Sequence, residues 1–277
     1  LIIVVIIMSA RLRLLILALL IYYCTGCEVN PITGQDEFML VSEEEDIAIG
    51  RKYAPEVEKQ LGGRIADDCL QYYLDSVGQK IVRISHKPHW EYHFTAVEDK
   101  STNAFALPGG HIFITKGMLE KLQTEAQLAA LLSHEIVHVV ARHSAAAQSR
   151  QGGLLLLVVG LGAAGAFPKD MPEGSAKMAQ LALQLISLTY SREQEREADL
   201  GGVDYAVVAG YDPNGAVELQ TMLQEQNDIR PIEFISTHPS PGNRIISLQG
   251  RIQARYQNLA NLRIGREDYR TNVLERL

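Results

Sequence analysis

The stretch that decides the fold reads Thr124-Glu125-Ala126-Gln127-Leu128-Ala129-Ala130-Leu131-Leu132-Ser133-His134-Glu135-Ile136-Val137-His138. It contains neither proline nor glycine, and Thr124 is a suitable N-cap, so the stretch predicts a helix. Its apolar side chains recur at steps of three and four residues, which predicts that the helix is largely buried. His134 and His138 then lie on one face of this helix, with Glu135 beside them. That spacing is typical of a zinc ion with an activated water and favours peptide-bond hydrolysis.

A pair of hydrogen-bonded core histidines is the alternative reading of this motif. A bare H-E-x-x-H run is expected by chance in roughly one chain in a hundred of this size. However, two histidines and a carboxylate on one buried helix are costly unless a partner neutralises them. We therefore favour a metal site over a purely structural role.

A catalytic zinc site needs a third protein ligand and one open position. The acidic segment 190–199 predicts a second helix, on which Glu195 and Asp199 lie four residues apart and share a face. Glu195 is the expected ligand. Asp199 is the expected acceptor for the second nitrogen of a ligand histidine. Glu193 and Glu197 fall elsewhere on the helix, and a solvated, salt-bridged face is the simpler interpretation for both.

Several segments together resemble the HtpX-type gluzincin metalloproteases, a family that also contains the CAAX prenyl-protein proteases. Within that family, the chain resembles the periplasmic BepA-like and LoiP-like lipoprotein members. The resemblance runs from about Cys27 to about Arg251. It rests on segments 30–34, 103–110, 134–143, 191–199 and 237–240 and on Arg244.

The resemblance implies one zinc ion per chain, with three ligands: His134, His138 and Glu195. It implies that Glu135 is the general base and that Asp199 supports the ligands from outside. It also implies that His238 lies near the metal, where it assists the transition state or occupies the open position in a latent state. Its sequence surroundings alone indicate a loop histidine, since Ser, Thr and Pro flank it. His238, Arg244 and a nearby tyrosine all remain candidates for supporting the oxyanion.

The rest of the pattern predicts an α+β fold that is mostly helical, with a small β-sheet beside the motif helix, and the resemblance implies a zincin-type metalloprotease domain. Residues 27–41 are expected to be a linker, residues 42–256 the protease domain, and residues 257–277 a loosely held tail. The expected helices span residues 42–61, 67–84, 190–209, 213–226 and 243–256. The expected strands lie near residues 92–96, 104–107 and 112–114.

Such a sheet offers an edge to an extended substrate. Asn103 and Gly109, in the turn at residues 108–110, are the expected substrate-binding residues, although Asn103 is equally well read as a turn residue. Arg142 and His143 receive no role, since both are expected on the far part of the motif helix. The uncharged segment 152–167 is too short for a comfortable membrane span, and we favour a buried helix or a mobile lid.

The start of the chain predicts export. Two arginines, an apolar run and small residues before Cys27 are typical of a lipoprotein signal peptide over residues 8–26, with Met8 as the start and Cys27 as the lipid-modified residue. A transmembrane anchor is the alternative, but it would bury each arginine at roughly 2.5–3.5 kcal/mol. We expect the periplasmic side of the bacterial envelope. Since Glu28 replaces the aspartate linked to inner-membrane retention, the outer membrane is favoured.

The 277 residues suffice for one sizeable domain, and the net charge of −7, without a basic block, argues against nucleic acid as a partner. Cys69 would be an unpaired cysteine in an oxidising compartment, and we expect it to be buried. The leading function is an endopeptidase for unfolded or misassembled envelope proteins. A chaperone-like protein with a latent, His-blocked zinc site is the first alternative, and a non-proteolytic zinc protein is the second.

Overall fold

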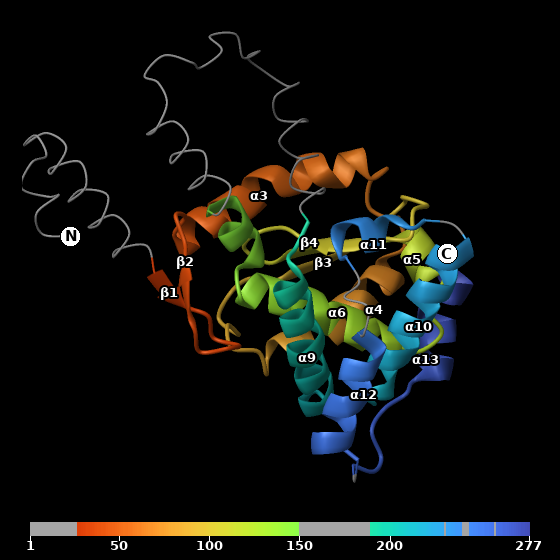
Figure 1. Ribbon diagram of the computed structural model, residues 1–277. Coiled ribbons are helices and arrows are strands. Elements are labelled where there is room, and N and C mark those ends of the chain that lie inside the picture. Colours follow the sequence, from red (N-terminus) through yellow and green to blue (C-terminus); the bar gives the residue numbers. More distant parts are fainter. Residues whose placement is uncertain (1–26, 150–188, 230, 240–243, 258) are drawn as a thin grey trace, which may run out of the picture.

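The computed structural model describes residues 27–149, 189–229, 231–239, 244–257 and 259–277. The predicted signal peptide and the uncharged segment 152–167 lie outside these residues. The fold is α+β and mostly helical, as predicted, and Figure 1 shows its helices arranged around a small sheet.

The sheet has three strands in the order β3-β5-β4: β3 (His93–Val97), β5 (His111–Thr115) and β4 (Ala104–Ala106). Strand β3 runs parallel to β5, and β4 runs antiparallel to it. The predicted turn between β4 and β5 depends on Gly109 and Gly110, whose φ angles of 76° and 104° favour glycine. The turn closes β4 onto β5 and thereby gives the sheet its antiparallel edge.

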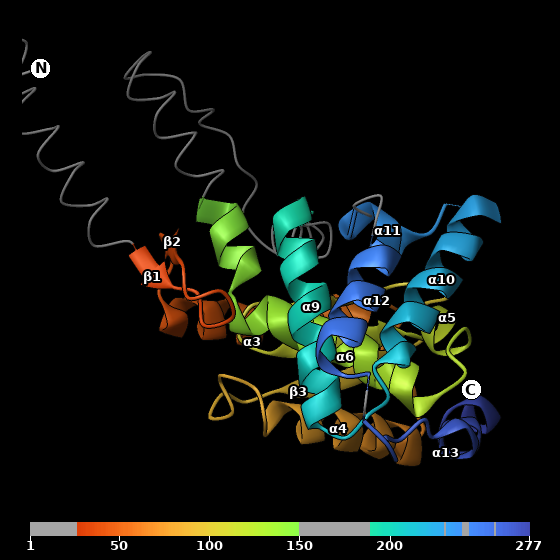
Figure 2. The same cartoon turned by 60° about the horizontal axis from the view of Figure 1, so that its bottom comes forward.

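Helix α6 (Glu125–Val140) carries the H-E-x-x-H motif, and all 16 of its residues are buried. Thr124 caps it, as predicted, by accepting a hydrogen bond from the Gln127 N–H. Helix α6 packs against α4 (Asp68–Val82) on one side and against α9 (Arg192–Val208) and α10 (Asn214–Ile229) on the other. Helix α12 (Arg244–Arg255) covers α9 and α10. The motif therefore lies in the hydrophobic core (Figure 2).

Helix α3 (Glu43–Gln60) runs above the sheet in Figure 1. The predicted capping box is present: the Ser42 hydroxyl accepts from the Glu45 N–H, and the Glu45 carboxylate accepts from the Ser42 N–H. Gly50 allows close packing on the turn before β5, since a Cβ there would lie 1.8 Å from the Pro108 carbonyl oxygen. A short helix, α5 (Lys116–Leu119), follows β5.

Residues 27–41, expected as a linker, contain an antiparallel hairpin of β1 (Cys27–Val29) and β2 (Asp36–Phe38). Asn30, at the end of β1, is 2% exposed and donates a hydrogen bond to Glu197 of α9. The hairpin is therefore part of the folded domain. Strands of three residues carry little periodicity, and β4, which is as short, was recognisable because the turn at residues 108–110 follows it.

The expected loose tail is also wrong, because the end of the chain is packed. It forms α13 (Arg266–Asn272) and a 3₁₀ turn, η1 (Leu274–Arg276). Tyr269 is fully buried, and its hydroxyl donates to the Leu119 carbonyl at 2.7 Å. The free N–H groups of Glu125 and Ala126 donate to the carbonyls of Gly265 and Ile264. The tail supplies acceptors that the first turn of α6 lacks within its own helix.

Cys69 is exposed and has a free thiol, contrary to the expectation of burial. It lies in the first turn of α4, whose buried face carries Leu70, Leu74 and Ile81. Cys69 lies on the opposite side of Leu70 from the buried Gln71, and so it falls outside that face. Among the helices in the described ranges, none is both long and apolar enough to span a bilayer.

Candidate metal centre

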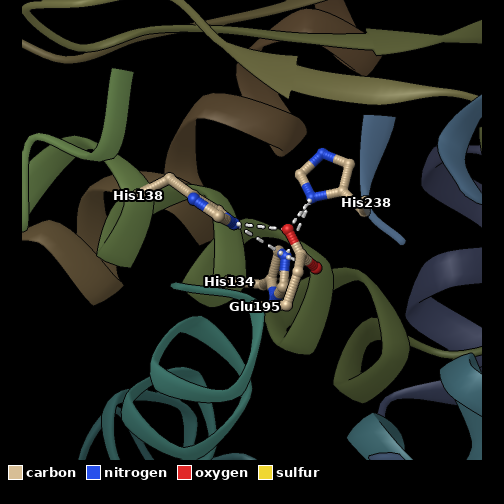
Figure 3. Close-up of side chains that lie close together, drawn as sticks. All are labelled: His134, His138, Glu195 and His238. Atoms are coloured by element: carbon tan, nitrogen blue, oxygen red, sulfur yellow. Dashed lines mark hydrogen bonds and ion pairs between the residues drawn. The ribbon is translucent and has the colours of Figure 1, made fainter. Parts of the chain in front are cut away.

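Four side chains from three parts of the chain meet beside α6: His134, His138, Glu195 and His238. Their ligand-type atoms all lie within 4.8 Å of one another, and all four residues are buried (Figure 3). The Nε2 atoms of His134 and His138 lie 3.6 and 3.5 Å from the Glu195 carboxylate oxygens. The structure thus brings together the three expected ligands and places His238 beside them, where the resemblance implied it would be.

Glu195 reaches the histidines because α9 begins just before it and crosses α6 closely. Ser191 and Gln194 form a capping box that starts the helix. Farther along α9, a Cβ on Gly202 would lie 3.1 Å from the His134 backbone nitrogen, so glycine permits the close crossing. The separation of the two helices sets the distance between the carboxylate and the imidazoles.

His238 is the C-cap residue of a short helix, α11 (Glu233–Thr237), where the sequence predicted only a loop. Its ring stacks on Phe234, with centroids 4.3 Å apart and an interplanar angle of 14°. Its Nδ1 lies 3.0 Å from a Glu195 oxygen and 3.3 Å from His134 Nε2. His238 is therefore a fourth residue with a ligand-type atom in the cluster, and it would compete for the position that a three-ligand zinc site leaves open.

Glu135 is fully buried, and neither of its carboxylate oxygens has a hydrogen-bond partner. Its nearest cationic neighbour is the Nε2 of His238, at 3.8 Å. Burial raises the pKa of Glu135 despite the histidines nearby. A carboxylate with a raised pKa beside a candidate metal is suited to accept and return a proton.

Asp199 lies beside the outer ring nitrogen of His134, and Arg244 binds Asp199. Asp199 Oδ1 lies 3.2 Å from His134 Nδ1. The Arg244 guanidinium donates two hydrogen bonds to Asp199, at 2.7 and 2.6 Å, and a third nitrogen lies 3.2 Å from Glu195. Burial alone raises the pKa of Asp199, but Arg244 and His134 outweigh it, and that pKa falls to about 2. Asp199 therefore stays ionised, which suits an acceptor for the imidazole N–H.

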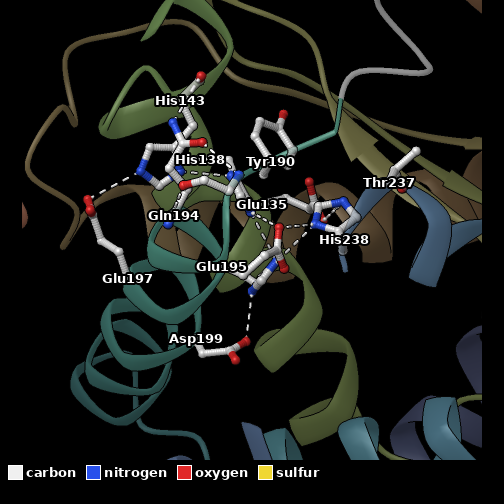
Figure 4. A network of polar contacts seen from close by, with 12 residues as sticks. Glu135, His138, His143, Tyr190, Gln194, Glu195, Glu197, Asp199, Thr237 and His238 are labelled. Atoms are coloured by element: carbon white, nitrogen blue, oxygen red, sulfur yellow. Dashed lines mark hydrogen bonds and ion pairs between the residues drawn. The ribbon is translucent and has the colours of Figure 1, made fainter. Parts of the chain in front are cut away.

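Three residues that received no site role from the sequence lie at or beside the centre: His143 and Tyr190 contact His138, and Glu197 contacts His143. The Nδ1 of His143 lies 2.8 Å from the Nδ1 of His138 (Figure 4). The Tyr190 ring stacks on His138 at 3.9 Å between centroids, while its hydroxyl lies 3.1 Å from the Ser144 hydroxyl. Tyr190 thus holds the ring of His138, and its own hydroxyl is engaged elsewhere.

The expectation that His143 lies away from the site is wrong, because α6 ends at Val140. Arg142 has a φ of 54°, and this left-handed residue turns the chain so that His143 faces His138. Glu197 is not a solvated residue either, since only 10% of its side chain is exposed and it lies 3.4 Å from His143 Nε2. The sequence holds no signal for a positive φ at an arginine.

The two expected substrate-binding residues differ in position. Gly109 lines the same small cavity as His138. Asn103 is buried just before β4, and its backbone N–H donates to the Thr115 hydroxyl of β5 at 3.1 Å. The contacts of Asn103 therefore join it to the sheet.

The residues of this centre fit a zinc ion. Two imidazoles and a carboxylate are the ligand set of many catalytic zinc sites. Several buried polar atoms here have no hydrogen-bond partner among the described residues: Glu195 Oε2, both Glu135 oxygens and His238 Nε2. Unpaired buried groups of this kind are costly, and a cation among them offsets that cost.

Comparison with known proteins gives a consistent result. The model of peptidase family M48 matches residues 69–252. A beta-barrel assembly-enhancing protease of Yersinia pestis is 28% identical over 231 residues, which cover 81% of this chain and 47% of that protein. The mitochondrial metalloendopeptidase OMA1 of Schizosaccharomyces pombe is 31% identical over 234 residues, which cover 83% of this chain and 67% of that protein. The human mitochondrial metalloendopeptidase OMA1 is 28% identical over 250 residues, which cover 83% of this chain and 46% of that protein. The chain thus spans about half the length of the bacterial and human relatives.

Proposed function

Because the chain belongs to peptidase family M48, we propose that it is a zinc-dependent metalloendopeptidase acting on unfolded or misassembled proteins of the bacterial cell envelope. The observation that carries the proposal is the buried cluster of His134, His138, Glu195 and His238 beside an unpartnered Glu135. The printed names of the bacterial relatives, beta-barrel assembly-enhancing proteases, support the choice of the envelope.

The proposed reaction is hydrolysis of an internal peptide bond. When bound, a zinc ion supplies a Lewis acid that polarises the scissile carbonyl and lowers the pKa of water. Glu135 takes a proton from the attacking water and passes it to the leaving amine. Asp199, held by Arg244, keeps the proton of His134 on Nδ1 and leaves Nε2 free to bind. Once His238 moves off Glu195, its ring is the nearest candidate for supporting the oxyanion.

The test combines metal content with digestion of casein. We expect the wild type to carry one zinc per chain and to cleave, and Glu135→Gln to keep zinc but lose activity by about 10²–10⁴-fold. Glu193→Gln is the matched control, since Glu193 is exposed on α9 and should leave activity unchanged. Unchanged activity in Glu135→Gln would remove the mechanism, and a wild type without stoichiometric zinc would remove the metal.

A chaperone-like function with a latent site is the second candidate, and the position of His238 favours it. His238 lies 3.0 Å from Glu195 and is fully buried, so the centre is closed in this conformation. If this closure is a latent state, His238→Ala should raise casein hydrolysis about tenfold. A tenfold change corresponds to about 1.4 kcal/mol, the free energy by which His238 would favour the closed state over the open one. A variant less active than the wild type would instead assign His238 to the reaction itself.

The proposed location is the periplasmic side of the envelope, with a lipid anchor on Cys27 and the outer membrane favoured. The sequence pattern before Cys27 supports this location, and β1 begins at that residue. Mass spectrometry of the mature N-terminus tests it. An unmodified Cys27 would refute the lipid anchor without touching the proposed chemistry.

A further inference from the structure

The two candidate ligand histidines differ in what holds their second nitrogen. A histidine that binds a metal through one ring nitrogen depends on a hydrogen bond at the other to fix its tautomer and orientation. For His134 the partner is the carboxylate of Asp199, at 3.2 Å. For His138, Nε2 faces the cluster, 3.1 Å from His134 Nε2, and Nδ1 lies 2.8 Å from His143.

We propose that His143 and Glu197 are positioning residues for His138 and that Asn30 of the N-terminal hairpin holds them in place. This inference rests on the proposed function and deepens it, because it assigns an outer support to a candidate ligand that lacks a carboxylate partner. The three residues come from three separate parts of the chain. Figure 4 shows His143 between His138 and Glu197.

The direction of the hydrogen bond between His138 and His143 follows from the proposed role of His138 as a metal ligand. His138 binds a metal through an unprotonated Nε2, so its proton is on Nδ1 and is donated to His143 Nδ1. His143 then carries its own proton on Nε2, which makes no hydrogen bond to a described residue but lies at ion-pair distance, 3.4 Å, from Glu197 Oε1. His143 is fully buried, and so its tautomer is set by these two neighbours. The carboxylate of Glu197 thus acts on His138 through an intervening ring.

Asn30 fixes the far end of this series. Its side-chain amide donates to Glu197 at 2.8 Å and to Glu37 of β2 at 2.7 Å. Its side-chain oxygen accepts from the Ile32 N–H at 2.9 Å, so both halves of the amide are engaged. Asn30 is 2% exposed, and its hydrogen bond holds the Glu197 carboxylate in place beside His143.

A second contact from the same hairpin holds the turn that carries His143. Arg142 has a positive φ and is 3% exposed. It forms ion pairs with Asp46 of α3, at 2.6 Å, and with Glu28 of β1. These pairs stabilise the backward turn after α6. The hairpin therefore contacts two residues that lie next to the metal centre: Asn30 contacts Glu197, and Glu28 contacts Arg142.

The experiment measures zinc affinity by competition with a chromophoric chelator. His143→Phe keeps a ring but removes the acceptor for His138, and we expect zinc binding about 10–100-fold weaker than in the wild type. His143→Gln offers a carbonyl oxygen as acceptor and should recover most of the affinity. Glu197→Gln should weaken binding, whereas the exposed control Glu193→Gln should not. Asp199→Asn, which acts on His134, provides the benchmark for the size of the effect.

A purely structural role is separated by the melting temperature of the metal-free protein and by the visible spectrum of the Co²⁺ form. We expect the metal-free melting temperature of His143→Gln and His143→Phe to match each other, while their zinc affinities and Co²⁺ spectra differ. Wild-type affinity in His143→Phe would overturn the proposal, and so would equal losses in both His143 variants. Because these readouts involve no hydrolysis, an inactive wild type or an active Glu135→Gln would refute the proposed function and leave this result standing.

Discussion

At the scale of single residues, burial decides how each ionisable side chain behaves. Glu135 and Asp199 are both buried carboxyls, yet their pKa values move in opposite directions. Arg244 donates two hydrogen bonds to Asp199, whereas neither oxygen of Glu135 has a hydrogen-bond partner. One carboxyl is therefore fixed in its charged form, and the other remains free to take up a proton.

The strand histidine His111 should make stability depend on pH. Burial lowers the pKa of His111 to about 4. The charges of Arg51 and of His93, whose ring stacks on His111 at 4.6 Å between centroids, act in the same direction, and Glu91 opposes them only weakly. The pKa of His111 in the folded state lies below its unfolded value of about 6.5. The contribution of neutral His111 to stability is therefore fully present above pH 6.5 and is lost as the pH falls toward 4.

Replacing His111 with Gln should therefore make this loss smaller by about 1–3 kcal/mol, as measured by urea unfolding at pH 7.5 and pH 4.5. His89→Gln is the control, since His89 is exposed and its removal should leave the pH dependence of unfolding unchanged. Identical pH dependence in the wild type and His111→Gln would contradict the role given to burial.

At the scale of elements, the crossing of α6 and α9 sets the geometry of the metal centre. The two helices approach closely at Gly201 and Gly202. A Cβ on Gly202 would lie 3.1 Å from the His134 backbone nitrogen, whereas one on Gly201 would meet only methyl groups of Val137 and Ile32, at 3.1 and 3.3 Å. Backbone atoms move less readily than the methyl groups at the end of a side chain. An added Cβ should therefore displace α9 more at Gly202 than at Gly201.

Gly202→Ala should push α9 away from α6 by a few tenths of an ångström and weaken zinc binding by about tenfold, because a metal site tolerates little displacement. Gly201→Ala should bind zinc nearly as tightly as the wild type. Chelator competition on both variants measures the difference. If the two alanine variants lose affinity equally, the helix separation does not control the site.

The sequence predicts the long elements well because their signals are local. Thr124 caps α6, and Ser42 with Glu45 caps α3, as expected from neighbouring residues alone. The same motif logic placed His134, His138 and Glu195 together, as the structure has them.

The contacts of His143 depend instead on tertiary structure. Its position follows from the positive φ of Arg142, which ion pairs with Asp46 and Glu28 stabilise. Partners this distant in sequence leave no periodic signal near residue 143. The short strands of the hairpin and the five-residue helix α11 are unpredictable for a related reason, since each is too brief to show a period.

At the scale of the whole molecule, both ends of the described chain brace α6. The hairpin contacts its C-terminal end through Arg142, and the segment around Gly265 accepts hydrogen bonds from its first turn. A helix whose residues are all buried cannot use water to satisfy its terminal N–H and C=O groups. The segment around Gly265 performs that task for the N–H groups of Glu125 and Ala126, and the hairpin holds the residue after α6, so both segments belong to the domain.

Removing the Tyr269 side chain should show that the last residues contribute to stability. Tyr269 is fully buried and donates to the Leu119 carbonyl, so Tyr269→Ala should cost about 3–5 kcal/mol of unfolding free energy. Tyr72→Ala is the control, since Tyr72 is 77% exposed and should change stability by less than about 0.5 kcal/mol. Urea denaturation measures both, and equal small effects would restore the picture of a loose tail.

The complete burial of Glu135, Glu195 and His238 has a kinetic consequence. A cation enclosed by these residues can leave only when the enclosure opens, however strong the chelator outside. Stripping by excess chelator should then proceed at a rate that no longer rises with chelator concentration. That plateau is the rate of spontaneous cation release, and the enclosure must open at least that often.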